Sequence, residues 1–510
     1  MVVVSVTPEI ALDESCTYAG GLGVLEGDKF YTAAKLKLDY IVLTLFYRKG
    51  YIDYEFHDNA LILKPQKHLH SFIEKLSPEE EFTIEIHGEK IIVKPWVYRY
   101  GTTKAVFFEA VSPEWASKLT EHVYIEESLE EKFYKYTLLA KASAYYIENV
   151  IGIDNVDYID LQEAYTVLVT LLLPLSHKYR MIIHTPGPWG YPVFPRDLIS
   201  REFEWNTTAQ QVVLTEIGLS KVKEAFVVSR KQLDVIKHIF PQYSYKIRYV
   251  TNGVDIDRWT HPEIKKAINT DSIDADKLWQ AHIRVKEKLL DLLKEYKNLD
   301  RDVSKMIIVW ARRIIRYKRP YFVVRFIEEL GNRLDVVFVL AGKPHPRDEE
   351  GKDTLKWFRI LHDNYSNVVL VHDYDVSKSK LILAGGDLLL FTPFSGREAC
   401  GTSYMKAGIN GVPTLSSRDS GALELIEDGV NGWLFGRDIR SFINIYEDPR
   451  AKEIDEKEYK EFKDKLMEII RIYYDEPENY KGVSYNAFKT FRAKADIVNT
   501  LKNYYSNILS

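Results

Sequence analysis

Short apolar runs alternate along this chain with longer stretches in which apolar and polar residues recur at helical spacing. Runs of this length, bounded by glycine and polar turns, are typical of buried strands. Strands that alternate with amphipathic helices form parallel sheets, because each parallel connection needs a crossover segment. The pattern therefore predicts an α/β fold.

In the first half of the chain, apolar runs predict strands at residues 2–6, 41–45, 156–161, 181–184, 226–229 and 247–250. Amphipathic periodicity predicts helices at residues 166–175 and 204–218. Residues 56–113 alternate polar and apolar side chains between glycine turns, which is the pattern of antiparallel strands. We therefore expect an antiparallel insertion in the first lobe.

A highly charged helical stretch, residues 261–302, separates the two halves and has the character of a connector. After it, apolar runs predict a second doubly wound sheet, with strands at residues 306–311, 336–342, 367–373, 387–392 and 412–417. We expect an N-terminal Rossmann-like lobe of residues 1–265 and a C-terminal one of residues 266–485, with a helix at about 486–510 that packs back on the first. Two such lobes place a cleft between the carboxyl ends of their strands, where α/β sheets bind ligands.

Composition narrows the class of protein further. Of the 510 residues, 46% are hydrophobic and 28% are charged, which excludes a disordered or fibrous protein. Lys and Arg number 69 against 74 Asp and Glu, so the formal charge of -5 provides no general attraction for nucleic acid or anionic membranes. No apolar run approaches the roughly 18 residues of a membrane span, and Cys16 and Cys400 are too few for a disulfide framework. We expect a cytoplasmic protein with reduced thiols and no nucleic-acid or membrane partner.

A glycine-rich motif, AGGLGVLEGD at residues 19–28, follows the first predicted strand and precedes an amphipathic helix. Glycine allows close backbone approach, and the N-terminus of a helix presents unpaired N–H groups to an anion. Gly20 and Gly21 are therefore candidate phosphate ligands. The same sequence is equally typical of a tight turn that only lets strand and helix pack.

A basic run, RRIIRYKR at residues 312–319, begins at the carboxyl end of the first strand of the second lobe. Basic runs are usually solvated faces. Here Arg313 and Lys318 lie five residues apart across a loop, so both can converge on one anion, Arg as a fork and Lys as a point charge. We favour an anion site.

The segment PFSGREACGTSYMKAGINGVP, at residues 393–413, carries the densest chemistry. Glu398 lies in its loop, Gly401 and Thr402 begin a helix, and Lys406 lies one turn further on the same helix face. A desolvated lysine near cations would have a lowered pKa and could form a Schiff base with an aldehyde cofactor. From spacing alone, an ordinary exposed helix lysine is the simpler interpretation.

Two histidine-containing groups are candidates for a metal site, His345 with Asp348 and His68 with His70. Neither group has a third ligand at a suitable spacing. We therefore expect no metal site.

Several separated blocks together resemble the α-glucan (glycogen and maltodextrin) phosphorylase family, particularly its short archaeal and bacterial type. The blocks lie in the family's order across about residues 13–436: DESCTYAGGLGVLEGD, LFYRKGYI, HTPGPWGYPVFP, VTNGVDIDRW, ARRIIRYKRP, VLAGKPHPRDEEGK, VVLVHDYDVSKSK and REACGTSYMKAGINGVPTLSSRDSGALE. Such a set is more specific than any one block. The resemblance implies two Rossmann-like doubly wound lobes facing a cleft, the GT-B glycosyltransferase fold, with pyridoxal 5′-phosphate as cofactor.

The resemblance also implies which residues surround the cofactor and the phosphates. Lys406 matches the lysine that carries the cofactor, and Gly401 and Thr402 match positions that hold its phosphate. Arg313 and Lys318 match the pair that gathers the substrate phosphate and the cofactor phosphate.

Other matching positions lie around the phosphates, the cofactor ring and the glucosyl unit. Gly20 and Gly21 fall on the glycine loop beside the phosphates. The resemblance gives Glu398, Asn252 and His184 as contacts of the glucosyl unit, and Tyr317 and Tyr374 as residues that line the same pocket. We expect Arg313, Lys318, His184 and Glu398 to be catalytic, Tyr374 to contact the cofactor, and Asp28 and Tyr165 to bind substrate as well.

The implied activity is the phosphorolysis of an α-1,4-glucan, glycogen or maltodextrin, to glucose 1-phosphate with retained configuration. In this family the cofactor's 5′-phosphate exchanges a proton with inorganic phosphate, which then protonates the glycosidic oxygen. Two phosphates held side by side repel each other, and Arg313 and Lys318 supply the local cations that they need. The expected partners are an α-glucan or maltooligosaccharide and inorganic phosphate, and the sequence is compatible with a homo-oligomer.

The sequence differs from the family pattern at several positions. Tyr165 stands where the family has the histidine of an Asn-Glu-Gly-His block, and Cys400 and Tyr404 replace smaller residues next to Lys406. Residues 424–433 resemble the tail of nucleotide-sugar glycosyltransferases, which share the fold.

Two alternative functions therefore stay open. The first is a nucleotide-sugar glycosyltransferase of the glycogen-synthase kind, in which Arg313 and Lys318 hold the diphosphate and Glu398 contacts the sugar. The second is a glucan-binding protein that keeps the fold without catalysis. Lys406 discriminates between them and a phosphorylase, because neither alternative needs a lysine that carries a cofactor.

Overall fold

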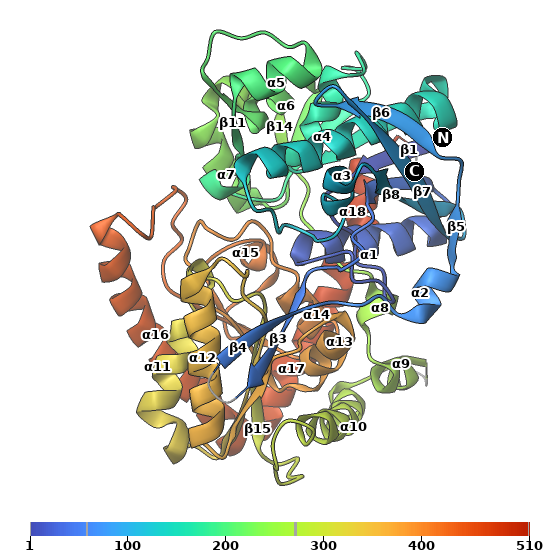
Figure 1. Ribbon diagram of the computed structural model, residues 1–510. Helices are drawn as coiled ribbons and strands as arrows, with labels where there is room; N and C mark the ends of the chain where they lie inside the picture. Colours follow the sequence, from blue (N-terminus) through green and yellow to red (C-terminus); the bar gives the residue numbers. More distant parts are fainter. Residues whose placement is uncertain (1, 58–59, 270–272, 508, 510) are drawn as a thin grey trace. The chain divides into compact units, whose positions relative to one another are not determined.

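The computed structural model describes residues 2–57, 60–269, 273–507 and 509. The chain forms two compact units, each of which gathers segments that are distant in the sequence. They are unit 1, with residues 1–52, 65–251 and 500–510, and unit 2, with residues 53–64 and 252–499. Each unit is built around one large sheet with helices packed against it (Figure 1).

In the described residues, the main sheet of unit 1 has ten strands. They are β1 (Val2–Val6), β2 (Asp39–Leu45), β5 (Leu76–Pro78), β6 (Phe82–Ile86), β7 (Glu89–Tyr100), β8 (Thr103–Ser112), β9 (Val156–Gln162), β10 (Tyr179–Ile183), β13 (Glu224–Val227) and β14 (Ile247–Tyr249). Their order is β14-β13-β10-β9-β1-β2-β8-β7-β5, with β6 paired to β7. The pairs from β14 to β8 are parallel, whereas β7 pairs antiparallel with β5, β6 and β8. This confirms the expected antiparallel insertion.

The helices of unit 1 connect and cover these strands. They are α1 (Gly21–Lys35), α2 (His70–Glu74), α3 (Glu114–Lys118), α4 (Leu129–Tyr146), α5 (Arg196–Phe203), α6 (Leu214–Lys221) and α7 (Arg230–Ile239). Shorter elements are the π-helix η1 (Ile147–Ile151), the 3-10 helices η2 (Ile153–Asn155), η3 (Ala164–Leu171), η4 (Pro188–Gly190) and η5 (Pro241–Lys246), and the strands β11 (Val193–Pro195) and β12 (Gln211–Val213).

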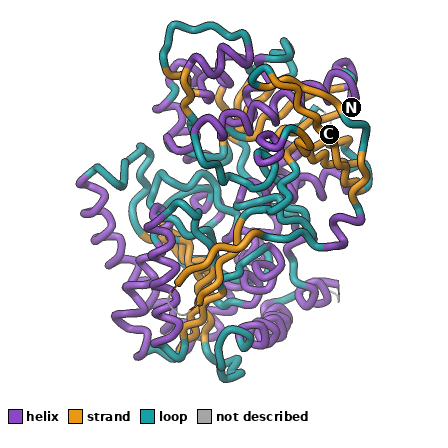
Figure 2. Tube along the Cα trace, viewed as in Figure 1, coloured by secondary structure: helices purple, strands orange, loops and turns teal. Residues whose placement is uncertain are grey.

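The main sheet of unit 2 has six strands, all parallel, in the order β17-β16-β15-β18-β19-β20. They are β15 (Met306–Ala311), β16 (Val336–Ala341), β17 (Val368–Val371), β18 (Leu388–Phe391), β19 (Thr414–Ser417) and β20 (Trp433–Phe435). Every residue of β15 and β16 is buried, as expected where helices cover both faces of a parallel sheet. Figure 2 shows these strands enclosed by helices.

The helices of unit 2 include two long ones near the end of the chain. They are α8 (Ile256–Trp259), α9 (Pro262–Asn269), α10 (Ala275–Leu293), α11 (Pro320–Leu330), α12 (Glu349–Asn364), α13 (Val376–Gly385), α14 (Ser403–Gly408), α15 (Ala422–Leu425), α16 (Pro449–Asp475) and α17 (Pro477–Lys494), with the 3-10 turns η6 (Arg316–Lys318) and η7 (Gly331–Arg333). A last helix, α18 (Ile497–Tyr504), begins in unit 2 and ends in unit 1. The small β3 (Ile52–His57) and β4 (Ala60–Pro65) pair packs on unit 2, where Asp53 accepts an ion pair from Lys343 at 2.6 Å.

Both main sheets are doubly wound. Numbered along the chain, the parallel strands of unit 2 run 3-2-1-4-5-6, and those of unit 1 begin 3-2-1-4-5 in the same way. In this topology the strand order reverses beside the first strand, and ligands bind at the carboxyl ends of the strands there. The expected α/β class with two Rossmann-like lobes is confirmed. The reversal lies between β15 and β18 in unit 2 and between β1 and β9 in unit 1.

Two helices predicted in the first half are wrong in type or extent. The expected helix at residues 204–218 begins only at Leu214, as α6, because Glu204 ends α5 in a left-handed conformation with φ 50° and residues 211–213 form β12. A run of Asn and Thr at residues 206–208 also disfavours helix. The expected α-helix at residues 166–175 is the 3-10 helix η3.

Within the described ranges, no helix is both long enough and apolar enough to span a bilayer.

The last residues of the chain are tied to the sheet of unit 1 by a buried ion pair. The guanidinium of Arg180 donates to both carboxylate oxygens of Asp160, at 2.7 and 2.8 Å, and to the backbone carbonyl of Tyr504 at 2.6 Å. The hydroxyl of Tyr505 donates to the same carboxylate at 2.6 Å. Because Arg180 and Asp160 are both buried, neither can exchange its partner for water.

We predict that Asp160→Ala destabilises unit 1 by about 3–5 kcal/mol, because it leaves the Arg180 charge buried without a partner. Release of the C-terminal segment should also speed tryptic cleavage at Lys502. The matched control is Asp157→Ala, an exposed position on the same strand, which should change stability by less than about 1 kcal/mol. Thermal unfolding and timed proteolysis measure both effects. Equal behaviour of the two variants would show that the buried pair does not hold this segment.

Candidate active site

Several charged residues of unit 2 lie where the strand order of its main sheet reverses, between β15 and β18. Arg312 and Arg313 follow the end of β15, and the loop that carries Glu398 follows the end of β18. Because β15 and β18 are parallel neighbours, their carboxyl ends meet at one edge of the sheet. Gly342, with φ 147°, allows a close approach here, since a Cβ at this position would lie 1.9 Å from the carbonyl oxygen of Arg312.

A buried ion cluster forms at this edge around Glu398. Its Oε2 accepts a hydrogen bond from Arg312 Nη2 at 2.6 Å and an ion pair from Lys318 Nζ at 3.6 Å. The backbone N–H of Glu398 donates to Asp419 at 2.9 Å, which fixes the loop. Burial alone would raise the pKa of Glu398, but Lys318, Arg312 and Arg313 together hold it below its usual value. The carboxylate is therefore ionised.

The cations of this cluster have donors that the carboxylate does not satisfy. Burial lowers the pKa of Lys318 to about 7, because Glu398 offsets only part of the cost of desolvation and the two arginines add to it. The Nε and Nη1 atoms of Arg312 are buried and have no hydrogen-bond acceptor among the described residues. Its guanidinium lies 4.1 Å from the centre of the Phe391 ring. The cluster is therefore suited to receive an anion.

Lys406 lies on α14, which follows the same loop. Its side chain is 7% exposed, and its Nζ lies 4.0 Å from the centre of the Trp259 ring. Asn410 ties the two residues together, because its Nδ2 donates to the carbonyls of both Lys406 and Trp259, at 2.8 and 2.9 Å. The ammonium of Lys406 is thus held in a buried aromatic setting, which excludes an ordinary exposed helix lysine.

The start of this loop is closely packed. A Cβ on Gly401 would lie 2.5 Å from the Phe391 ring and 3.6 Å from Arg312 Nη2, so only glycine fits beside the cluster. Thr402, the first residue before α14, is also buried. Asn252 donates to the carbonyl of Cys400 at 3.3 Å, while its buried Oδ1 meets no donor within the described part of the chain.

Two tyrosines complete the predicted set in unit 2. Tyr317 is buried and Tyr374 is half-buried. In both cases burial is the main cause of a raised pKa, and the Arg312 charge acts on both. Of the residues of unit 2 that the sequence singled out, the structure brings Arg313, Tyr317, Lys318 and Gly401 to the cluster around Glu398 and Arg312. Lys406 and Asn252 instead contact Trp259 and Cys400.

In unit 1, the N-terminus of α1 already meets a carboxylate. Glu9 Oε2 accepts hydrogen bonds from the backbone N–H groups of Ala19, at 2.6 Å, and Gly20, at 3.1 Å. A Cβ on Gly21 would touch nothing within 4 Å, so the packing does not require glycine there. The anion at this helix start is thus Glu9 of the chain itself.

The other predicted residues of unit 1 lie near the end of β9 and β10 or on α1. His184 Nε2 lies 2.8 Å from Gln162 Oε1, which also accepts from Lys29 at 3.3 Å. Burial and then the Lys29 charge lower the pKa of His184 well below its usual value. A neutral His184 therefore donates from Nε2 and keeps a lone pair on Nδ1. Asp28, also on α1, is fully buried.

Tyr165 packs within unit 1. Its ring stacks on Tyr136 with centroids 4.2 Å apart, and Lys132 Nζ lies 4.9 Å from the ring centre. The residue is half-buried. Its place in the structure is therefore fixed by α4.

Two charged residues of the candidate site were not predicted from the sequence. One is Arg312, which lies beside the predicted Arg313 and donates to Glu398. Glu163 follows β9 at the reversal point of unit 1, in a left-handed conformation with φ 67° that favours glycine. Its Oε1 accepts from Thr185 at 2.5 Å, and its buried Oε2 meets no donor in the described ranges. The sequence held one sign of this residue: Glu163 is a charged residue directly after a buried strand.

In the part of the chain that the structure describes, no three His, Cys, Asp or Glu side chains are grouped to hold a metal ion. Asp348, a candidate in the sequence, caps α12 by accepting from the backbone N–H of Gly351 at 2.9 Å.

We predict that Glu163→Gln stabilises the protein above neutral pH. Burial raises the pKa of Glu163 to about 7 from 4.5, so the folded state keeps a proton that the unfolded chain releases. This contribution is full below about pH 4.5 and is lost as pH rises to about 7, at a cost of up to roughly 3 kcal/mol. Unfolding measured at pH 5 and pH 8 should show the variant gaining on the wild type with pH. An exposed control, Glu148→Gln, should show a constant difference, and the same result for Glu163→Gln would contradict the prediction.

Comparison with known proteins places these residues in a family. The chain matches the family model described as carbohydrate phosphorylase over residues 248–506. It is 26% identical to a maltodextrin phosphorylase of Thermococcus litoralis, over 84% of this chain and 63% of that protein. It is also 26% identical to a glycogen phosphorylase of Aquifex aeolicus, over 85% of this chain and 76% of that one. A glycogen phosphorylase of Mycobacterium tuberculosis is 24% identical, over 82% of this chain and 60% of its own length.

The chain thus spans less than two thirds of the Thermococcus and Mycobacterium proteins. The family model nevertheless covers more than half of the 510 residues, including the ion cluster around Glu398 and the buried Lys406. On this evidence the chain belongs to the carbohydrate phosphorylase family.

Proposed function

We propose that this protein is an α-glucan phosphorylase, which uses inorganic phosphate to release glucose 1-phosphate from an α-1,4-glucan with retained configuration. The observation that carries the proposal is the cluster around the carboxylate of Glu398, in which buried Arg312 and half-buried Lys318 pair with it and the charge of Arg313 acts on it. Its unsatisfied guanidinium N–H groups need an anion. The names of the similar archaeal and bacterial proteins, maltodextrin and glycogen phosphorylase, support this choice of reaction.

The residues in unit 2 fit pyridoxal 5′-phosphate. Lys406 offers a buried amine, and the unpartnered Nε and Nη1 of Arg312 offer donors for a phosphate beside Gly401. We propose that Lys406 holds the cofactor and that Gly401, Thr402 and Tyr374 line its site. When bound, the cofactor would supply a phosphate that exchanges a proton with the substrate phosphate.

In this proposal Arg313 and Lys318 bind the inorganic phosphate. Two phosphates close together repel each other, and the excess positive charge of the cluster offsets that repulsion. A bound anion would also return the proton to Lys318, whose pKa burial lowers to about 7. Glu398 keeps the cations in place and is our candidate contact with the glucosyl hydroxyls. The buried setting excludes water, which favours transfer to phosphate over hydrolysis.

We assign glucan binding to unit 1 and cofactor and phosphate binding to unit 2. In unit 1, His184, Asp28 and Tyr165 are proposed sugar contacts, whereas the backbone N–H of Gly20 already donates to Glu9. The neutral His184 can accept a hydroxyl proton at Nδ1.

In unit 2, Asn252 and Tyr317 are proposed sugar contacts, and Asn252 Oδ1 can accept a hydroxyl that no donor in the described ranges now supplies. The partners of the enzyme would be an α-glucan or maltooligosaccharide and inorganic phosphate, and the protein would act in the cytoplasm. A homo-oligomer is compatible with this scheme.

The proposal is tested by product analysis together with reduction of the holoenzyme. Incubation with maltoheptaose and phosphate should yield glucose 1-phosphate, and borohydride should fix a pyridoxyl mass on the peptide that contains Lys406. Lys406→Ala should lower phosphorolysis at least about 10²-fold. The matched control is Lys380→Ala, because Lys380 also approaches the Trp259 ring, at 5.9 Å, but lies on α13. This control should keep its pyridoxyl group.

Two results would contradict the proposal. An unmodified Lys406 peptide, with glucosyl transfer from ADP-glucose or UDP-glucose, would establish a nucleotide-sugar transferase. Glucan binding without turnover of either donor would establish a non-catalytic glucan-binding protein.

A further inference from the structure

Arg319 is a further buried cation of unit 2, and it directly follows Lys318 in the chain. Its side chain is fully buried. A buried charge is costly unless the chain surrounds it with partners. Arg319 has such partners in two places, at the end of β18 and on α16.

Four groups accept hydrogen bonds from the guanidinium of Arg319. Its Nε donates to the carbonyl of Thr392 at 2.8 Å, and its Nη2 donates to the carbonyl of Pro393 at 3.0 Å. Its Nη1 donates to two carboxylates of α16, Glu458 at 2.6 Å and Asp455 at 3.2 Å. Because the two carbonyls begin the loop after β18, this one side chain joins that loop to α16.

The loop after β18 and the basic turn η6 are also joined directly to each other. The hydroxyl of Thr392 donates to the carbonyl of Lys318 at 2.8 Å, and the backbone N–H of Phe394 donates to the carbonyl of Tyr317 at 2.7 Å. The loop carries the carboxylate of the ion cluster, and the turn carries its ammonium. The two segments therefore form one assembly, which Arg319 fastens to α16.

The backbone of Arg319 is a second, independent observation. The residue has φ 50° and ψ 51°, a left-handed conformation that favours glycine or asparagine, and it directly precedes α11. A bulky residue persists in this conformation only where the surrounding contacts determine it. Here these contacts are the four hydrogen bonds of the guanidinium and the Phe322 ring, whose centre lies 4.4 Å away. The side chain, and not the turn, therefore requires an arginine.

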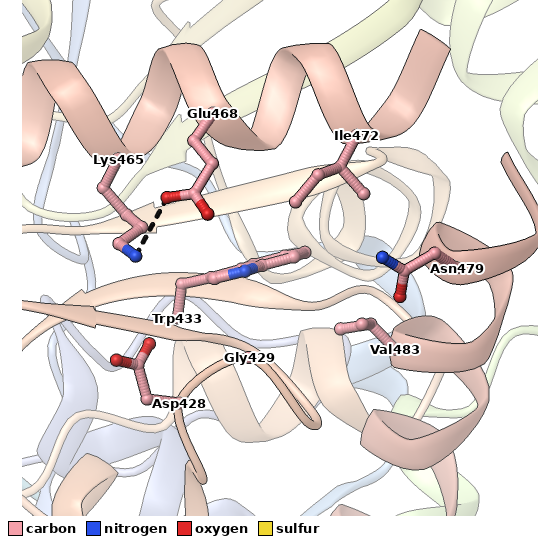
Figure 3. A pocket seen from close by; sticks show the side chains of 8 residues that line it. All are labelled: Asp428, Gly429, Trp433, Lys465, Glu468, Ile472, Asn479 and Val483. Carbon is pink, nitrogen blue, oxygen red and sulfur yellow. Dashed lines mark ion pairs between the residues drawn. The ribbon is translucent and has the colours of Figure 1, made fainter. Parts of the chain in front are cut away.

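The helix that receives Arg319 is packed into the core of unit 2. Phe462 and Leu466 of α16 are fully buried, and the Phe462 ring meets Phe435 of β20 with centroids 5.4 Å apart. Farther along the helix, Ile472 and Trp433 line a pocket of about 320 Å³ where β20 meets α16 and α17 (Figure 3). Because α16 is held against the sheet in this way, it is a firm support for the two segments of the ion cluster.

We propose that Arg319 is a positioning residue of the anion site, which holds Lys318 and the loop of Glu398 in the arrangement that receives an anion. That this anion is inorganic phosphate rests on the proposed function, whereas the positioning role rests on the contacts of the guanidinium. A lysine cannot replace Arg319, because an ammonium is a point charge on a flexible stem and lacks the planar fork that reaches acceptors on two sides.

The first test compares the binding of sulfate, which stands in for phosphate, by the full-length wild type and Arg319→Lys. Isothermal titration below the unfolding temperature of both proteins should show about tenfold weaker binding in the variant, because the donors of the cluster lose their alignment. The KM for phosphate should rise by a similar factor. The matched control is Arg325→Lys, because Arg325 of α11 also pairs with α16, at 2.9 Å from Glu456, but is exposed. This control should bind sulfate as the wild type does.

The second test uses Asp455→Asn, which removes one charge on the α16 side and keeps the shape of the side chain. Asp455 is half-buried, so this variant should fold even where Arg319→Lys does not. Its affinity for sulfate should fall about threefold, because one of the acceptors of the guanidinium is weakened.

A role of Arg319 in stability alone would lower the unfolding temperature of the variants and leave their sulfate affinity unchanged. Wild-type sulfate affinity in folded Arg319→Lys, or in Asp455→Asn, would overturn the inference. If the wild type still releases glucose 1-phosphate in that case, the proposed function stands without this positioning residue. Weaker sulfate binding in the variants of a protein that forms no glucose 1-phosphate would do the reverse.

Discussion

One buried interaction organises the chemistry of unit 2: the carboxylate of Glu398 lies between the guanidinium of Arg312 and the ammonium of Lys318. Burying charge is costly unless every charge is paired. Here one carboxylate meets more than one cation, and two nitrogens of the guanidinium, Nε and Nη1, have no acceptor within the described ranges. The cost is visible in Lys318, whose pKa falls to about 7. A site built in this way gains stability when an anion enters it, which is what a phosphate-using enzyme requires.

The topology of the two sheets explains why the charged residues meet. Each sheet reverses its strand order beside its first strand, and the loops after the two central strands carry the ionisable groups. In unit 2 these groups are Arg312 and Glu398, and in unit 1 they are Glu9 and Glu163. Closely packed glycines support the arrangement, because a side chain at Gly342 or Gly401 would strike Arg312 or Phe391. The same elements that form the core therefore place the functional groups.

Much of this architecture follows from the sequence, but local details decide the rest. Apolar runs located most central strands, because strands buried on both faces are nearly continuous in apolar residues. The helix expected at residues 204–218 begins ten residues late, at Leu214, because Glu204 adopts a left-handed conformation and β12 pairs with β11. Periodicity reveals neither feature. The three-residue β20 was too short to recognise.

For the site, as for the fold, the sequence predicted some residues, and tertiary packing decided the place of the others. Spacing singled out Arg313 and Lys318, and the family resemblance singled out Lys406 and the role of Glu398. Arg312 and Glu163, which directly follow the ends of β15 and β9, were not singled out. The sequence predicted a phosphate site at the helix start near Gly20, but Glu9, eleven residues earlier in the chain, already accepts the Gly20 N–H. Trp433 belongs to a pocket made by α16 and α17, which no local pattern connects to β20.

The most direct test of this account is the equilibrium binding of sulfate to the full-length protein at pH 6.5, where sulfate stands in for phosphate. Isothermal titration should show that the wild type binds sulfate and that Arg312→Met binds it at least about tenfold more weakly, since hydrogen bonds to a charged group are lost. Thermal unfolding would verify that the variant is folded. Equal sulfate affinity in the two proteins would contradict the claim that the buried cluster is built to hold an anion.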